Sequence, residues 1–426
     1  MEQCVNKRIK KILSSEMIQN ASKMLVLQIV TTIIGFISSI IIARTLGPED
    51  KGKVDLFLLL TNYIVEFGII GVGTGFLYYQ TNQKIKIELI HGTSLFFCGI
   101  MGLIIFFAGV LFHRSIEPLF EGLSTKWIIL AFCLAPLLLY RQISGNIIQG
   151  INKPKFNYQS SLLINLFMLV MVVILAFMGS ITYGHMIIVN VFGIIIYIAC
   201  SSNLIIRQSS KPKVDLALLI KVMKYGIAIY IGAFANSLLF KMDQNFLNYY
   251  WGNKYVGCYS VAVNFAEMLW SLDGIINAVT LYHIASNEEK TAKRILKKAI
   301  LIQIGISGFL GVLLGMFAPY LIHVLYGKEY SEAIIGIQIL IPGIVVWSMG
   351  RLFSQYITLN IGKPFWCTLA TIFGIVINYV LNDLWIPDYG IRGAASASVI
   401  SYICVVIIVI VIFFTIKGEK NEQVIK

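Results

Sequence analysis

Long apolar runs separated by short polar connections fill almost the whole chain. A helix needs roughly 20 apolar residues to cross a bilayer, and each run is about that long or longer. The pattern therefore predicts an all-α integral membrane protein with about twelve transmembrane helices. They are expected near residues 21–44, 54–80, 89–113, 125–149, 157–179, 184–206, 219–250, 257–285, 295–322, 333–360, 365–386 and 390–416.

A polar linker at residues 207–218 divides the chain into two halves of six spans each. The first half is residues 1–206, and the second half with its tail is residues 219–426. Parallel halves related by an axis along the membrane normal are a transporter architecture, with the substrate path between them. We expect two pseudo-symmetric six-helix bundles around a central cavity.

Two internal matches support this division. In the stronger one, five residues recur 210 positions apart, at the ends of the fourth and tenth spans. The pairs are Arg141 and Arg351, Ser144 and Ser354, Ile147 and Ile357, Lys153 and Lys363, and Pro154 and Pro364. A weaker match, at an offset of 205, joins residues 46–54 to residues 251–259. The two Lys-Pro pairs are interpreted either as matched hinges or as simple helix caps.

The charges favour a membrane protein and not a nucleic-acid-binding one. Only 13% of the residues are charged, against about 25% in soluble domains. The net charge of +13 comes largely from loops on one side, because 23 of the 34 Lys and Arg fall on the side of the N-terminus. The positive-inside rule then places both termini in the cytoplasm. No GxxxxGK(S/T) phosphate loop is present, so energy would come from an ion gradient, the membrane potential or consumption of product. We also expect no cofactor, no bound metal and no catalytic residues.

Several acidic residues lie inside the apolar runs. A charge there costs about 2.5–3.5 kcal/mol on insertion scales and usually faces a cavity or a partner. Lys241 and Asp243 are two positions apart, so they point to nearly opposite sides of their helix and each needs its own partner. The candidates for charge balance or for binding a coupling cation are Glu66, Asp243, Glu267 and Asp273.

A polar stripe marks the tenth span. Ser348, Arg351, Gln355 and Thr358 follow the spacing i, i+3, i+7, i+10, which is one face of a helix. Lipid cannot satisfy such a face, so it points inward. Hydrogen bonding between helices would explain the hydroxyl and amide groups without any ligand, but it does not explain the arginine.

One arginine in each half lies inside a span. Arginine presents a planar fork that matches phosphate and carboxylate oxygens. Our hypothesis is that Arg141 and Arg351, together with Lys241 or Arg44, hold a pyrophosphate. Arg44 ends the first span, so reaching for the membrane interface is an alternative role for it.

Four segments carry a family resemblance. They are IIARTLGPEDKGKV (41–54), KMDQNFLNYYWGNKYVGCYSVAV (241–263), LYGKEYSEA (325–333) and NYVLNDLWIPDYGIRGAASASVISY (378–402). With these segments the chain resembles the Wzx-type polysaccharide flippases of the multidrug/oligosaccharidyl-lipid/polysaccharide exporter superfamily. The last segment, with its Ile-Pro-x-Tyr-Gly-Ile-x-Gly-Ala-Ala pattern, is the most specific.

The resemblance implies a function in the bacterial cytoplasmic membrane. Such a flippase moves an undecaprenyl-pyrophosphate-linked oligosaccharide, such as an O-antigen unit of lipopolysaccharide or a capsule unit, to the outer leaflet by alternating access. Its partners would be this lipid-linked glycan, membrane lipids, a coupling H⁺ or Na⁺, and other membrane proteins of polysaccharide assembly. By span order alone, Arg44 corresponds to a cationic cavity residue of related lipid II flippases.

Two other readings of the chain remain open. A cation-coupled multidrug exporter of the same superfamily is favoured by the four acidic candidates. A membrane-embedded polysaccharide polymerase or ligase is disfavoured, because such enzymes usually carry a long extracytoplasmic loop. Here no connection exceeds about a dozen residues.

Overall fold

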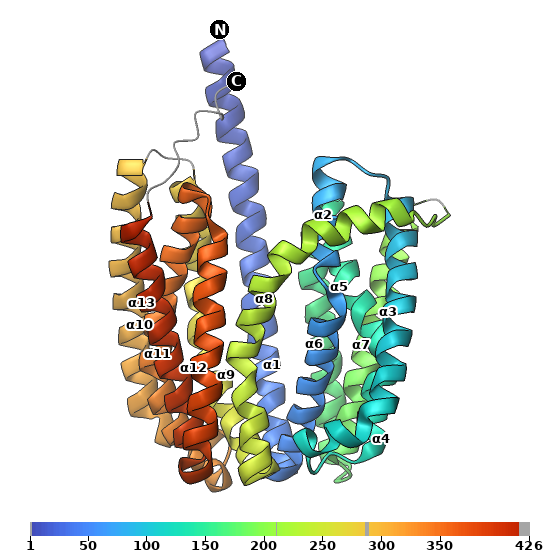
Figure 1. Ribbon diagram of the computed structural model, residues 1–426, viewed down its shortest axis with the longest axis vertical. Helices are drawn as coiled ribbons and strands as arrows, with labels where there is room; N and C mark the ends of the chain where they lie inside the picture. The colour runs from blue at the N-terminus through green and yellow to red at the C-terminus, as the bar shows by residue number, and fades with distance from the viewer. Residues whose placement is uncertain (1, 210, 286–288, 417–426) are drawn as a thin grey trace. The chain divides into compact units, whose positions relative to one another are not determined.

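The chain is built from helices. The computed structural model describes residues 2–209, 211–285 and 289–416, and these ranges contain helices and turns but no strand (Figure 1). The helices of the first half are α1 (Glu2–Ile69), α2 (Val72–Asn82), α3 (Ile87–Ile116), η1 (Glu117–Phe120), α4 (Thr125–Cys133), α5 (Ala135–Gly150), α6 (Pro154–Phe177) and α7 (Tyr183–Ile206). The second half has α8 (Leu216–Trp251), α9 (Asn253–Ala285), α10 (Glu289–Leu325), η2 (Lys328–Tyr330), α11 (Glu332–Tyr356), η3 (Ile357–Ile361), α12 (Pro364–Tyr389) and α13 (Ile391–Thr415). The expected all-α class is confirmed.

The candidate membrane spans of the described residues agree approximately with the expected twelve. Within the described residues, eight helices are long and apolar enough to cross a membrane, or up to ten if two bent pairs each count as one span. One of the eight, Val26–Ile69, covers 44 residues and includes parts of the first two expected spans. Gly47, with φ 72°, breaks the helix between them. The second expected span breaks again at Ile70 and Gly71, whose φ angles are 42° and 70°.

The helices group into two compact units, which we describe separately. The described part of the N-terminal unit contains residues 2–46, 67–108, 132–209 and 211–226. The described part of the C-terminal unit contains residues 47–66, 109–131, 227–285 and 289–416. In the N-terminal unit α5 packs against α2 and α7 around Phe76, Leu139 and Ile143. In the C-terminal unit α11 packs against α9, α10 and α13, and α12 against α13 (Figure 1).

Small residues allow the helices of the C-terminal unit to approach closely. Gly336, Gly343 and Gly350 recur every seven positions along α11. A Cβ added to Gly350 would lie 2.4 Å from Val406 of α13, and one added to Gly343 would lie 2.8 Å from Val399. Between apolar helices in lipid, this kind of close backbone approach supplies van der Waals contact that the hydrophobic effect does not. The glycines therefore set the α11–α13 distance on which the pocket described below depends.

The two Lys-Pro turns have the same local backbone. Asn152 and Gly362 are both left-handed, with φ 58° and 76°. The lysine after each is the N-cap of the next helix, with φ −120° at Lys153 and −121° at Lys363. Each helix then begins with proline, whose fixed φ and missing N–H suit a first helical position. The repeat seen in the sequence is thus reproduced in the backbone, and both lysines are helix caps.

Candidate functional site

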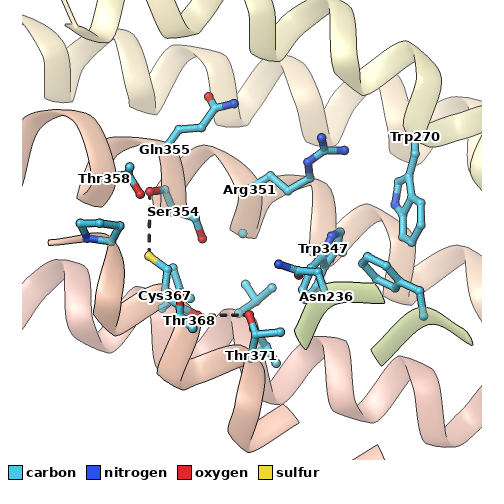
Figure 2. A pocket seen from close by; sticks show the side chains of 16 residues that line it. Asn236, Trp270, Trp347, Arg351, Ser354, Gln355, Thr358, Cys367, Thr368 and Thr371 are labelled. Atoms are coloured by element: carbon cyan, nitrogen blue, oxygen red, sulfur yellow. Dashed lines mark hydrogen bonds between the residues drawn. The ribbon is translucent and has the colours of Figure 1, made fainter. Parts of the chain in front are cut away.

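A pocket of about 560 Å³ lies within the C-terminal unit (Figure 2). Side chains from α8, α9, α11, α12 and α13, together with η3, line it. This volume falls inside the usual range for small-molecule sites. The walls differ in character, with polar groups from α11, η3 and α12 and aromatic rings from α8, α9 and α11.

The polar wall comes largely from the stripe predicted in the sequence. Arg351, Gln355 and Thr358 line the pocket, and Ser354 joins them. Ser348 does not line it, because its side chain is fully buried and donates a hydrogen bond to the Ile344 carbonyl at 2.9 Å. The binding roles of Arg351 and Gln355 stay predictions.

The aromatic wall consists of Phe240, Trp270 and Trp347. The ring centroid of Phe240 lies 4.8 Å from that of Trp270 and 5.2 Å from that of Trp347. Tyr402 of α13 lies behind them, 5.3 Å from Trp347. Figure 2 shows the Arg351 side chain on the side of the pocket where the two indoles stand. The Phe240–Trp347 contact is edge-to-face and the other two pairs are tilted, and such contacts favour fixed ring orientations.

Helix α12 contributes hydroxyl and thiol groups to the pocket. Cys367, Thr368 and Thr371 all belong to its lining. The Cys367 sulfur lies 3.9 Å from the Ser354 carbonyl oxygen, and the Thr371 hydroxyl donates to the Cys367 carbonyl at 3.1 Å (Figure 2). The first contact connects α12 to the polar wall of α11, and the second lies within α12.

The charge of the pocket is positive. Among the described residues that line it, Arg351 is the charged one and none is a carboxylate. Two further polar atoms of the lining residues, Gln355 Oε1 and Trp270 Nε1, are buried and have no hydrogen-bond partner. Leaving a buried polar atom unpaired costs about 1–3 kcal/mol. A ligand with both anionic and hydrogen-bonding groups would suit this lining.

Acidic residues border a second, much smaller cavity in the same unit. Asp243 and Glu267 line it, and Phe240 and Trp270 line both cavities. Asp243 is 1% exposed. It accepts hydrogen bonds from the hydroxyls of Tyr259 and Ser398, the latter at 3.0 Å. The aromatic pair therefore forms a wall between the acidic residues and the arginine.

The Asp243 carboxylate belongs to a buried chain of polar groups. Ser398 lies 3.5 Å from the Asn378 amide nitrogen, and the Asn382 amide donates to the Asn378 oxygen at 2.9 Å. Asn378, Asn382 and Ser398 are fully buried. The Asn382 side-chain oxygen has no hydrogen-bond partner. Ser398 thus connects the Asp243 carboxylate to two buried asparagines.

Lys241 of α8 has acidic neighbours from α1 and α9. The positive charge of Lys241 interacts with the carboxylates of Glu66 and Glu267. The Tyr230 hydroxyl donates to the Glu66 backbone carbonyl. Lys241 therefore has acidic partners from other helices, as the sequence analysis expected, and Glu66 and Glu267 both belong to the C-terminal unit. The side chain of Asp273 falls in the stretch 271–290 and lies outside the described residues.

The remaining two predicted cations belong to the N-terminal unit. The Arg141 guanidinium lies over the Tyr197 ring, 5.8 Å from its centroid. The Tyr197 hydroxyl donates to Asn157 at 3.3 Å. Arg44 lies exposed on α1, three residues before the break at Gly47. Convergence of Arg141 and Arg44 with Arg351 on one site stays a prediction.

The sequence analysis missed a buried ionic cluster in the C-terminal unit. Lys51 Nζ lies 2.6 Å from Asp55 Oδ2 and donates to Ser260 Oγ at 2.7 Å. Ser260 in turn donates to Asp55. Burial, with the Asp55 carboxylate nearby, raises the pKa of Tyr330, so its phenol stays neutral. The weaker repeat at offset 205 was the available signal, since it ends one residue short of Asp55 and of Ser260.

Comparison with known sequences bears on what this fold does. The model of the family described as polysaccharide biosynthesis protein matches residues 17–282. The chain belongs to this family. That assignment agrees with the flippase resemblance carried by the four sequence segments.

Two curated relatives match parts of the chain. An uncharacterized membrane protein of Methanocaldococcus jannaschii is 28% identical over 234 residues, which are 53% of this chain and 45% of the relative. A probable low-salt glycan biosynthesis flippase of Haloferax volcanii is 24% identical over 218 residues, 49% of this chain and 45% of the relative. The chain spans about half the length of the curated relatives it matches.

Solved structures extend the likeness over nearly the whole chain. Lipid II flippase MurJ in an inward closed conformation has a TM-score of 0.73, with 15% identity, over 91% of this chain and 86% of that one. An inward-facing multidrug resistance MATE transporter of the MOP superfamily has a TM-score of 0.72, with 16% identity, over 90% and 94%. At such identities the likeness concerns the fold, which is that of MOP superfamily transporters.

Proposed function

We propose that the chain is a flippase that moves polyprenyl-pyrophosphate-linked oligosaccharides across the cytoplasmic membrane by alternating access. The observation that carries the proposal is the pocket of the C-terminal unit. Its described lining has an arginine and no carboxylate, in a chain that belongs to the polysaccharide biosynthesis family. A positive, partly aromatic pocket suits the anionic headgroup of a lipid-linked glycan. An undecaprenyl-linked O-antigen or capsule unit is the cargo that the sequence resemblance implies.

In this proposal the arginines hold the pyrophosphate. Arg351 would bind its oxygens through the guanidinium fork, and Arg141 and Arg44 would do so from the N-terminal unit. Lys241 is the weaker candidate, because Glu66 and Glu267 already offset its charge. Both termini would lie in the cytoplasm, as the distribution of Lys and Arg predicts.

A coupling cation would bind at Asp243. Small hard cations prefer oxygen ligands. Ser398 Oγ contacts the Asp243 carboxylate, and Asn378 and Asn382 continue the buried polar chain behind Ser398. The Asn382 oxygen is buried without a hydrogen-bond partner, so it has a lone pair to offer. Na⁺ is the probe for this site, with H⁺ as the other candidate.

The test is deletion of the gene in its host, followed by analysis of surface glycans and lipid-linked intermediates. We expect loss of one surface polysaccharide and accumulation of its lipid-linked repeat unit on the cytoplasmic face. Wild type and Arg392→Ala, an exposed arginine outside the pocket lining, should restore the glycan. Arg351→Ala should not, at equal protein level. Restoration by Arg351→Ala would overturn the role of Arg351, and unchanged glycans in the deletion strain would overturn the proposed function.

The rival function is cation-coupled export of cationic drugs. The exposed carboxylate of Glu267 beside the second cavity and the similarity to a MATE transporter fold favour it. Increased sensitivity of the deletion strain to cationic dyes, with an unchanged surface, would be its signature.

A further inference from the structure

The C-terminal pocket has one apolar aromatic side and one side of hydroxyl and amide groups. Phe240, Trp270 and Trp347 form the first side, and Ser354, Gln355 and Thr368 are typical of the second. A pyrophosphate alone would not pack against aromatic rings, since it is anionic on every side. A pyranose ring has an apolar C–H face and a rim of hydroxyls, which is the same division that the pocket shows.

The buried polar atoms of the lining residues fit hydroxyl chemistry. Trp270 Nε1 is a donor and Gln355 Oε1 is an acceptor, and neither has a partner in the protein. A sugar hydroxyl both donates and accepts, so small rotations of these side chains would let one sugar satisfy both. Hydrogen-bond donors and acceptors beside an aromatic surface give orientation as well as affinity.

Arg351 places the two chemistries next to each other. It belongs to the same lining as Trp270, Trp347 and Gln355, and Figure 2 shows it on the side of the indoles. In a lipid-linked glycan the first sugar is bonded directly to the pyrophosphate. A site that holds the pyrophosphate therefore brings this sugar to the neighbouring wall.

We propose that the C-terminal pocket is a subsite for the sugar attached to the pyrophosphate, with its ring against Trp270 and Trp347 and its hydroxyls toward Gln355. This inference rests on the proposed function. It adds that the protein recognises the first sugar of the lipid-linked glycan as well as the pyrophosphate. The two indoles select for a ring with a flat apolar face, and Gln355 selects for a hydroxyl or amide at its rim.

The experiment measures binding of two synthetic probes to the purified protein in nanodiscs. One probe is a short-chain polyprenyl pyrophosphate, and the other is the same lipid bearing one N-acetylhexosamine. Binding is read as protection of Cys367, which lines the pocket, from a small thiol reagent in a variant whose other six cysteines are replaced. The test variants are Trp270→Leu and Gln355→Leu. The control is Trp366→Phe, which is 40% exposed on α12 and outside the lining.

Wild type should bind the sugar-bearing probe about tenfold more tightly than the bare one. Trp270→Leu should remove that difference without weakening the bare probe, whereas Arg351→Ala should weaken both. Trp270→Phe should retain part of the preference for the sugar-bearing probe, because phenylalanine still offers an aromatic face. If Trp270 only supported the fold, the preference would not depend on an aromatic ring at this position. Equal binding of the two probes by wild type, or equal weakening of both by Trp270→Leu, would overturn the subsite and leave the flippase function standing. Failure of wild type to bind either probe would overturn both.

Discussion

Asp55 and Ser260 directly follow the two segments of the weaker sequence repeat, 205 positions apart, and the Ser260 hydroxyl donates a hydrogen bond to Asp55. The glycines around them are paired in the same way, with Gly47 matching Gly252 at φ 72° and 79°. Two related segments of the chain therefore meet at their own equivalent positions. Lys51, which is 4% exposed in its side chain, completes the contact.

We expect the Lys51–Asp55 pair to be necessary for stability. Asp55→Ala leaves the ammonium group of Lys51 buried without its carboxylate, which costs about 3–5 kcal/mol. The matched control is Glu49→Ala, because Glu49 is 70% exposed and lies 3.3 Å from Lys53, and an exposed pair contributes roughly 0–1 kcal/mol. Thermal unfolding in detergent checks this, and equal losses for the two variants would contradict it. Replacing Lys51 by Met and Asp55 by Leu together should recover most of the stability.

The same contact leaves no room for side chains on two glycines. A Cβ on Gly52 would lie 1.9 Å from the Asn253 backbone oxygen, and one on Gly257 would lie 2.0 Å from that of Pro48. Either Gly→Ala change must push the segments apart, at a cost of about 1–3 kcal/mol or more. Gly99→Ala, with nothing within 4 Å of its added Cβ, should instead be neutral or stabilise by up to about 1 kcal/mol. Size-exclusion profiles after heating would distinguish the destabilised variants Gly52→Ala and Gly257→Ala from Gly99→Ala. A normal profile for Gly52→Ala would contradict the close approach of Gly52 to Asn253.

The helices were predictable from the sequence because lipid forces each apolar segment to satisfy its own backbone hydrogen bonds. The position of Arg351 was predictable because the 3.6-residue period places it on one face with Gln355. The aromatic wall was not, since an indole that lines a pocket and one that faces lipid look alike in a sequence. Trp270 and Trp366 differ only in what tertiary packing puts beside them.

The breaks and the ionic cluster escaped the sequence analysis for different reasons. Ile70 is a β-branched residue with φ 42°, and such a residue is normally excluded from the left-handed region. Gly71, with φ 70°, is the local signal for the break, but a glycine inside an apolar run is also tolerated in a helix. Lys51 was assigned to a polar connection, and nothing local distinguishes it from exposed Lys residues. Its burial follows from the approach of residues 257–260, which are distant in the sequence.

Asp243 should determine the cation dependence of transport. Asp243→Asn keeps the shape and the capacity to accept from Ser398 but removes the negative charge. A hydrogen bond or contact to a charged group is worth about 1.5–3 kcal/mol, so Na⁺ affinity should fall more than about tenfold. Asp383→Asn is the control, because Asp383 is exposed and accepts from Tyr250 at 3.2 Å. Calorimetric titration of Na⁺ at fixed pH checks this, and a titration over pH replaces it if wild type binds no Na⁺. Unchanged cation affinity in Asp243→Asn would rule the site out.

Phe240 and Trp270 should couple the two cavities, because each ring lines both of them. A cation bound in the cavity of Asp243 and a glycan bound in the cavity of Arg351 would both contact this pair of rings, whose centroids are 4.8 Å apart. Coupling between two ligands is reciprocal and typically amounts to about 5–150-fold in affinity. We therefore expect the coupling cation to change the affinity for the lipid-linked probe at least about fivefold, and the probe to change the cation affinity by the same factor.

Phe240→Leu should bring that factor close to one while each ligand still binds alone. Leucine keeps the wall apolar but lacks the ring that meets both Trp270 and Trp347. Phe373→Leu, 55% exposed on α12, should leave the factor unchanged. The measurement is a full binding square, with each ligand titrated in the presence and absence of the other. Undiminished coupling in Phe240→Leu would show that the two cavities communicate by another route, since a two-state element must be biased by both sites to transmit between them.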